Sequence, residues 1–195
     1  MTTRILGIDS SLTGTGLSRA TVSNHGVAVE PWPEGTRFHA TVELATVGAR
    51  NPKKTDTWLH KSERVHEVLD KVDGALADGP YDAVGLEELA YGAQGSAVVV
   101  LHWLWGEIIW RVHQHGYPLY LANVASVKQL GTGKGNAKKD VMMLAMASRY
   151  PEYGIKDNNQ SDAVAVSMLI ARKLGVPFDT APKSHNPNLD KVVLQ

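Results

Sequence analysis

Residues 4–18 read RILGIDSSLTGTGLS, and this stretch decides the fold. Residues 4–9 form a short apolar run that ends in a carboxylate, which is typical of a buried strand. The stretch after it is rich in Ser, Thr and Gly and predicts a tight turn, and residues 16–22 predict a returning strand. The chain is therefore expected to open with an antiparallel hairpin.

The remaining elements extend this hairpin into an α/β protein. Residues 26–30 and 38–47 predict further strands, and a helix follows, with Thr55 or Asp56 as its cap and apolar residues at helical spacing from Trp58 to Leu76. Residues 82–87 (DAVGLE) are again an apolar run ending in an acid, and the strand–helix–strand order implies a parallel crossover. Helices are expected over 96–114, 136–149 and 160–174, and a strand over 119–124. The predicted fold class is α/β, with a mixed central sheet of antiparallel hairpin strands and parallel strands, flanked by helices.

Length and composition limit the class of protein. The 195 residues suffice for one domain with a substantial core, and 43% hydrophobic and 21% charged residues exclude a disordered chain. The absence of cysteine excludes a disulfide framework, a thiolate zinc site and a cysteine nucleophile. We expect one domain over 1–175, and a loosely attached extension over 176–195, which has three prolines and weak periodicity.

Charge and targeting signals give two further expectations. Lys plus Arg and Asp plus Glu number 20 each, so any site for a polyanion must be local. No secretory signal and no apolar stretch long enough to span a bilayer is visible, so we expect a cytoplasmic protein without membrane contact.

Three acids stand at positions where they could converge. Asp9 and Glu87 each end a predicted buried strand, and ligands of open α/β sheets bind at the carboxyl ends of the strands. Asp162 is placed in the first turn of the last long helix. Each acid alone also has a structural interpretation, as a turn former, a solvated strand end or a helix-dipole partner. Together they predict a site for a divalent cation, because clustered buried carboxylates repel one another without one.

Basic residues fall into two clusters. The glycine-rich segment 125–139 carries four lysines and no acid, and a second cluster lies near residue 50. Such clusters are either solvated surface or sites for a phosphate backbone. The residues are Lys128, Lys134, Lys138 and Lys139 in the first cluster, and Arg50, Lys53 and Lys54 in the second.

These segments together resemble the RuvC-type Holliday-junction resolvases, which are nucleases with an RNase H-like fold. The opening stretch resembles their first strand and hairpin, DAVGLEELAYG (82–92) the strand with the catalytic Glu, and SAVVVLHWLWGEII (96–109) the long helix after it. VASVKQLGTGKGNAKKDVM (124–142) resembles the lysine-bearing segment, and QSDAVAVSMLIA (160–171) the terminal helix with its Asp. The matching blocks run in unbroken order from residue 4 to residue 172.

The resemblance implies roles for individual residues. Asp9, Glu87 and Asp162 match the metal ligands, and Lys128 and Lys139 match lysines that contact the phosphate or assist the reaction. Two Mg²⁺ ions per site are implied, with Mn²⁺ as a substitute. The family places an acid or a His three residues before its last Asp, where this chain has Asn159, so Asn159 or the nearby Asp157 is the candidate fourth ligand.

The implied activity is cleavage of four-way or other branched DNA by a homodimer. Trp103 and Trp110 are candidate interface residues, although core packing is an alternative for both. Tyr91 lies one position away from a family aromatic and is not assigned its role. Three other interpretations remain open: a YqgF-like RNA nuclease, an actin-like nucleotide-binding domain and a catalytically inactive DNA-binding module.

Overall fold

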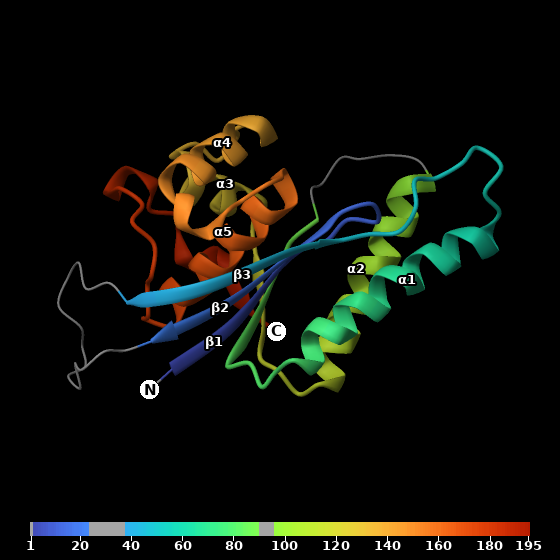
Figure 1. Ribbon diagram of the computed structural model, residues 1–195, viewed down its shortest axis with the longest axis horizontal. Coiled ribbons are helices and arrows are strands. Elements are labelled where there is room, and N and C mark those ends of the chain that lie inside the picture. Colours follow the sequence, from blue (N-terminus) through green and yellow to red (C-terminus); the bar gives the residue numbers. More distant parts are fainter. Residues whose placement is uncertain (1, 24–37, 90–95) are drawn as a thin grey trace.

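The computed structural model describes residues 2–23, 38–89 and 96–195, which form a mixed sheet covered by helices on both faces (Figure 1). The six strands lie in the order β3-β2-β1-β4-β5-β6. β1 pairs antiparallel with β2 and parallel with β4, which confirms the predicted mixed sheet. The strands are β1 (Thr2–Asp9), β2 (Thr15–Ser23), β3 (His39–Val47), β4 (Ala83–Glu87), β5 (Leu119–Ala122) and β6 (Val192–Leu194).

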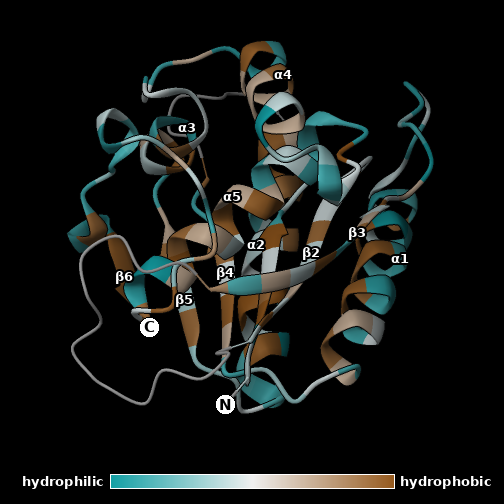
Figure 2. Cartoon of the chain, turned by 60° about the vertical axis from the view of Figure 1, so that its left-hand side comes forward, coloured by the Kyte–Doolittle hydropathy of each residue, from teal (hydrophilic) through white to brown (hydrophobic). Residues whose placement is uncertain are grey.

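The helices divide between the two faces of the sheet, as Figure 1 shows. One face is covered by α1 (Trp58–Ala77) and α2 (Ser96–Gln114). The other carries α3 (Val124–Thr132), α4 (Lys139–Arg149) and α5 (Asn158–Lys173). Each face has its own apolar core, and residues 160–171 of α5 are buried all round, so α5 forms the centre of its layer. Figure 2 shows the hydrophobic colouring concentrated on the strands and on the inner sides of the helices.

Two glycines of the sheet let α5 lie close to the strands. A Cβ on Gly7 of β1 would lie 2.4 Å from the carbonyl oxygen of Ala163, and a Cβ on Gly85 of β4 would lie 2.7 Å from a methyl group of Val166. Real side chains do not tolerate such distances, so only glycine permits this approach. Each glycine stands two residues before a strand-ending acid, and alternation puts the acid on the same face of the sheet.

Several element boundaries differ from the sequence-based expectations. Thr57, and neither Thr55 nor Asp56, caps α1, because its hydroxyl accepts the amide N–H of His60. α4 begins at Lys139 rather than at residue 136, since a turn closed by Ala137 N–H and the Lys134 carbonyl precedes it. The predicted strand over 119–124 ends at residue 122, and α3 begins at residue 124. The strand predicted over 26–30 lies outside the described residues.

α5 begins earlier than predicted. Its cap is Asp157, which accepts the Gln160 amide N–H, and the helix starts at Asn158. Asp162 therefore lies in the second turn and not in the first, so proximity to the helix start no longer explains its position.

The expectation that residues 176–195 are loosely attached is wrong. Phe178 is buried in the core of the α3–α5 layer, and Asp179 forms a paired contact with Arg172 at 2.6 and 2.7 Å. β6 adds an antiparallel edge strand to β5. The prolines of this segment interrupt periodicity without preventing packing, which is why hydrophobic periodicity missed these contacts.

Candidate active site

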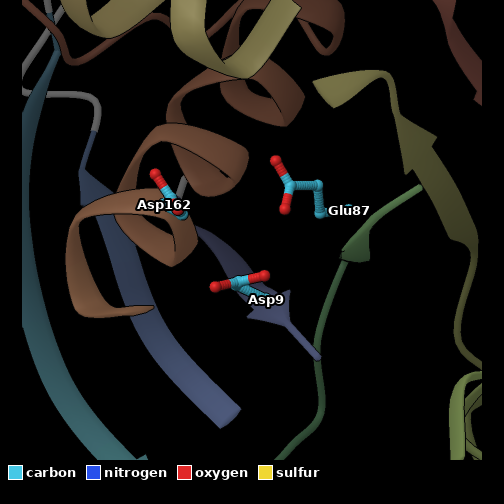
Figure 3. Close-up of side chains that lie close together, drawn as sticks. All are labelled: Asp9, Glu87 and Asp162. Atoms are coloured by element: carbon cyan, nitrogen blue, oxygen red, sulfur yellow. The ribbon is translucent and has the colours of Figure 1, made fainter. Parts of the chain in front are cut away.

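Three acids meet at the carboxyl ends of β1 and β4, beside α5. Asp9 and Glu87 are the last residues of two neighbouring parallel strands, and the pairing of Ile8 with Leu86 brings the two acids level. Alternation along each strand turns both side chains toward α5, on the same face as Gly7 and Gly85. Because those glycines admit α5, Asp162 reaches the same point from above the sheet (Figure 3).

The three carboxylates are close enough to share a ligand. One oxygen from each of Asp9, Glu87 and Asp162 lies within 4.8 Å of the others. Asp9 and Asp162 are only 6% and 5% exposed. Within the described part of the chain, Asp9 Oδ2 is one of the buried side-chain oxygens that receive no hydrogen bond.

This crowding makes the ionised forms costly. Burial is the main reason that the pKa of Asp9 is raised. Burial also raises the pKa of Glu87 well above its usual range, and the charges of Asp9 and Asp162 raise it further. For Asp162, burial followed by the charge of Asp9 raises the pKa to about 7. Desolvation and like charges both favour the protonated acid, so the cluster as it stands disfavours its own charge.

A divalent cation fits this donor set. Hard cations such as Mg²⁺ prefer carboxylate oxygens, and they offset both the mutual repulsion and the loss of hydration. The Asp9 oxygen that lacks a hydrogen-bond partner is available for such a contact. The chemistry of the three acids therefore matches the predicted metal site.

The two candidates for a fourth ligand differ in their surroundings. Both Asp157 oxygens are engaged, Oδ1 with the Gln160 amide and Oδ2 with the Thr46 hydroxyl at 2.6 Å. Asn159 lies against β2 and the turn before it, because a Cβ on Gly14 would be 2.7 Å from its Nδ2. Asp157 thus holds the start of α5, and its charge also raises the pKa of Asp9, so it lies near the cluster. Both residues remain candidates for the fourth ligand.

Two of the four lysines in the glycine-rich segment lie close enough to the acids to lower their pKa values. The charge of Lys139 lowers the pKa of Asp9, Glu87 and Asp162, and that of Lys128 lowers the pKa of Asp162. Lys139 is the first residue of α4 and is exposed. Lys134 and Lys138 are exposed in the turn before it, where no contact with the acids is recorded among the described residues.

The second basic cluster lies on the other side of the sheet. Figure 1 places the loop before α1, which carries these residues, on the α1–α2 side. The Arg50 guanidinium is paired with both oxygens of Asp56 at 2.9 and 2.8 Å, so its charge is locally compensated. Lys53 and Lys54 are exposed and remain candidates for contact with a phosphate backbone.

Two hydrogen bonds that the sequence did not predict lie at Glu87 and at the neighbouring Glu88. The Trp105 indole N–H of α2 donates to the Glu87 carbonyl at 3.0 Å. The neighbouring Glu88 accepts from the Asn123 amide at 3.0 Å, and Asn123 also caps α3. An Asn just after a strand and before an apolar helical stretch is a capping signal that could have located α3 from the sequence.

Comparison with solved structures identifies the architecture. The structure of Thermus thermophilus RuvC matches with a TM-score of 0.61 and 22% identity, covering 90% of this chain and 98% of that one. The fold is that of RuvC. The structure of T. thermophilus RuvC in complex with Holliday junction substrate matches with a TM-score of 0.58 and 18% identity, covering 92% and 99% of the two chains. The predicted RNase H-like fold is thereby confirmed. No protein-family model and no curated protein matches the sequence.

The two tryptophans of α2 have different environments. Trp103 is half-buried against the α1–α2 core and makes an edge-to-face contact with His66, whereas Trp110 is 53% exposed. Core packing therefore accounts for Trp103, and Trp110 stays a candidate interface residue. Tyr91 lies outside the described residues. Among the helices in the described ranges, none has the length and hydrophobicity that crossing a bilayer requires.

Proposed function

We propose that this chain is a metal-dependent endodeoxyribonuclease that cleaves four-way or other branched DNA by hydrolysing phosphodiester bonds. The observation that carries the proposal is the meeting of two buried acids and one half-buried acid within 4.8 Å at the end of a RuvC-like sheet. The branched substrate is supported by the likeness to the RuvC structure that contains Holliday junction substrate.

Asp9, Glu87 and Asp162 are the proposed metal ligands, with Asn159 as a fourth, uncharged ligand. Two Mg²⁺ ions, for which Mn²⁺ substitutes, supply Lewis-acid stabilisation and an activated water when bound to such a site. Two of the three side chains are fixed at strand ends and one on the buried part of α5, which supports a constant geometry among them.

The lysines complete the proposed site. Lys139 lies near all three acids and is suited to stabilise the negative charge that develops on the phosphate during cleavage. Lys128 has the same relation to Asp162 alone, which suits it to hold the phosphate in place. Lys134, Lys138, Lys53 and Lys54 are the proposed backbone contacts farther along the DNA, where they contribute affinity and salt dependence.

We further propose that the active form is a homodimer. A four-way junction presents two equivalent strands, and paired cuts on them require two sites related by a two-fold axis. Trp110 is the proposed contact residue, because it is exposed and lines a cleft of about 350 Å³ with Ile109 and Tyr117.

A cleavage assay tests the proposal. The protein is incubated with a labelled four-way junction, linear duplex, single strand and RNA hairpin, each with Mg²⁺ or with EDTA. We expect cleavage of the junction with Mg²⁺ only, loss of cleavage in Asp9→Asn, and retained junction binding by that variant. Preferential cleavage of the RNA hairpin would favour an RNA nuclease, and undiminished cleavage by Asp9→Asn would refute the site.

A further inference from the structure

The C-terminal turn Lys183–His185 packs against the end of α3 and the glycine-rich loop after it. His185 Nδ1 lies 3.0 Å from the Leu130 carbonyl oxygen, which requires Nδ1 to carry the proton and donate. The Gln129 side-chain amide donates to the Ser184 carbonyl at 3.0 Å. Two hydrogen bonds, one donated by the tail and one donated by α3, thus join the tail to the last turn of α3.

The His185 ring also occupies the space above the loop. Gly133 ends α3 in the left-handed conformation, with φ of 78°, and a Cβ there would lie 2.9 Å from the His185 ring. The next residue is Lys134, whose backbone N–H donates to the Thr132 hydroxyl. The ring therefore contacts the loop one residue before its exposed lysine.

The tail is itself anchored on α5. Arg172 binds Asp179 and also donates to the Asn186 side chain at 2.8 Å, next to the turn. Lys173 donates to the Leu189 carbonyl at 3.1 Å. The tail thus connects the helix that carries Asp162 with the loop that carries Lys134, and motion of that loop relative to the acids is restricted.

We propose that His185 is a positioning residue for DNA: it fixes the Gly133–Lys134 turn so that Lys134 meets a phosphate of the substrate at a set distance from the acids. This inference rests on the proposed nuclease function. The physical reason is entropic: a lysine on a mobile loop loses conformational entropy when it binds a phosphate. A loop that is fixed beforehand loses less entropy, so binding is tighter.

The test compares His185→Ala with the conservative His185→Asn, whose amide nitrogen can take the place of Nδ1. Junction binding is measured in the Asp9→Asn background between 50 and 200 mM salt, and KM and kcat are measured without that change. For His185→Ala we expect about a 3- to 10-fold higher Kd, a salt slope shallower by about 1, and a raised KM with kcat unchanged. His185→Asn should restore binding to within about twofold.

A double-mutant cycle with Lys134→Ala separates positioning from general stability. If His185 acts through Lys134, the double variant should bind no worse than Lys134→Ala alone. Gln129→Met, which removes the other contact with the tail, provides a second variant should His185→Ala fold poorly, and it should also raise Kd. Unchanged Kd and salt slope in both variants, additive effects in the cycle, or no restoration by Asn would overturn the inference. If the parent protein binds no junction, the proposed function fails instead.

Discussion

Replacing Asp162 with Asn should stabilise the metal-free protein at neutral and higher pH. Asn has nearly the same size and shape, but it removes a charge that is 5% exposed and faces Asp9. Removal of a buried acid usually destabilises a protein, because the acid has a partner. For Asp162, burial and the charge of Asp9 outweigh the charges of Lys139 and Lys128, so the expected effect has the opposite sign.

The magnitude follows from the raised pKa. Burial and the charge of Asp9 move the pKa of Asp162 from 3.8 to about 7, which corresponds to an upper bound of about 4 kcal/mol. Relaxation and water entry reduce this figure, and about 2 kcal/mol is a reasonable expectation. The folded protein holds the proton more tightly than the unfolded chain, so stability falls as pH rises from about 4 to about 7. For the full shift of the pKa to about 7, the penalty is complete at pH 8 and about two fifths as large at pH 5, and a smaller shift reduces the penalty at pH 8 more than that at pH 5.

Calorimetry in EDTA measures the effect. Asp162→Asn should raise Tm by about 4–8 °C at pH 8 and by clearly less at pH 5. Mg²⁺ should raise the Tm of the parent protein more than that of the variant. Asp179→Asn is the matched control, since Asp179 is equally buried but paired with Arg172, and its loss should destabilise at both pH values. A lower Tm for Asp162→Asn at pH 8 would refute the reasoning.

Five further substitutions, one of them a control, test the site and other parts of the molecule. Asn159→Asp should lower the Mg²⁺ concentration for half-maximal cleavage about tenfold, because it adds a charged ligand; an unchanged metal titration would exclude Asn159 from the site. Gly7→Ala should lower the free energy of unfolding by about 1–3 kcal/mol and weaken Mg²⁺ binding, because its Cβ would meet a backbone carbonyl of α5 at 2.4 Å. Gly74→Ala, which meets nothing within 4 Å, should be neutral or stabilising in the same chemical denaturation assay. Lys139→Met should lower kcat for the junction about 100-fold with little change in Kd, and equal losses in kcat and binding would contradict its assigned role. Trp110→Glu should shift sedimentation from dimer to monomer, whereas a parent protein that is already monomeric would contradict the proposed interface.

The central part of the fold could be predicted because its signals are local. An apolar run ending in Asp9, a second ending in Glu87 and the intervening helix specify two adjacent parallel strands with both acids at one edge. Strand pairing then fixes the distance between those two acids almost regardless of the rest of the chain. Asp162 was added to the predicted site because of the family resemblance and its place in a predicted helix. Neither signal predicts how deeply its side chain is buried.

Other features depend on contacts between distant residues and left no periodic signal. The role of Gly7 and Gly85 appears only when α5 is placed on the sheet, although both precede an acid by two residues. The pairing of Arg50 with Asp56 was also not predicted. The packing of the tail was not predicted, because it depends on single contacts such as the ion pair of Asp179 with Arg172. Such contacts produce no periodic pattern in the sequence.

The most direct test is a crystal structure of the protein grown with Mn²⁺, with anomalous differences measured at the manganese edge. The account predicts an anomalous peak about 2.0–2.3 Å from oxygens of Asp9, Glu87 and Asp162, and its loss in Asp9→Asn crystals. A map without a peak among these three side chains, at a Mn²⁺ concentration that supports cleavage, would contradict the claim that they form the metal site.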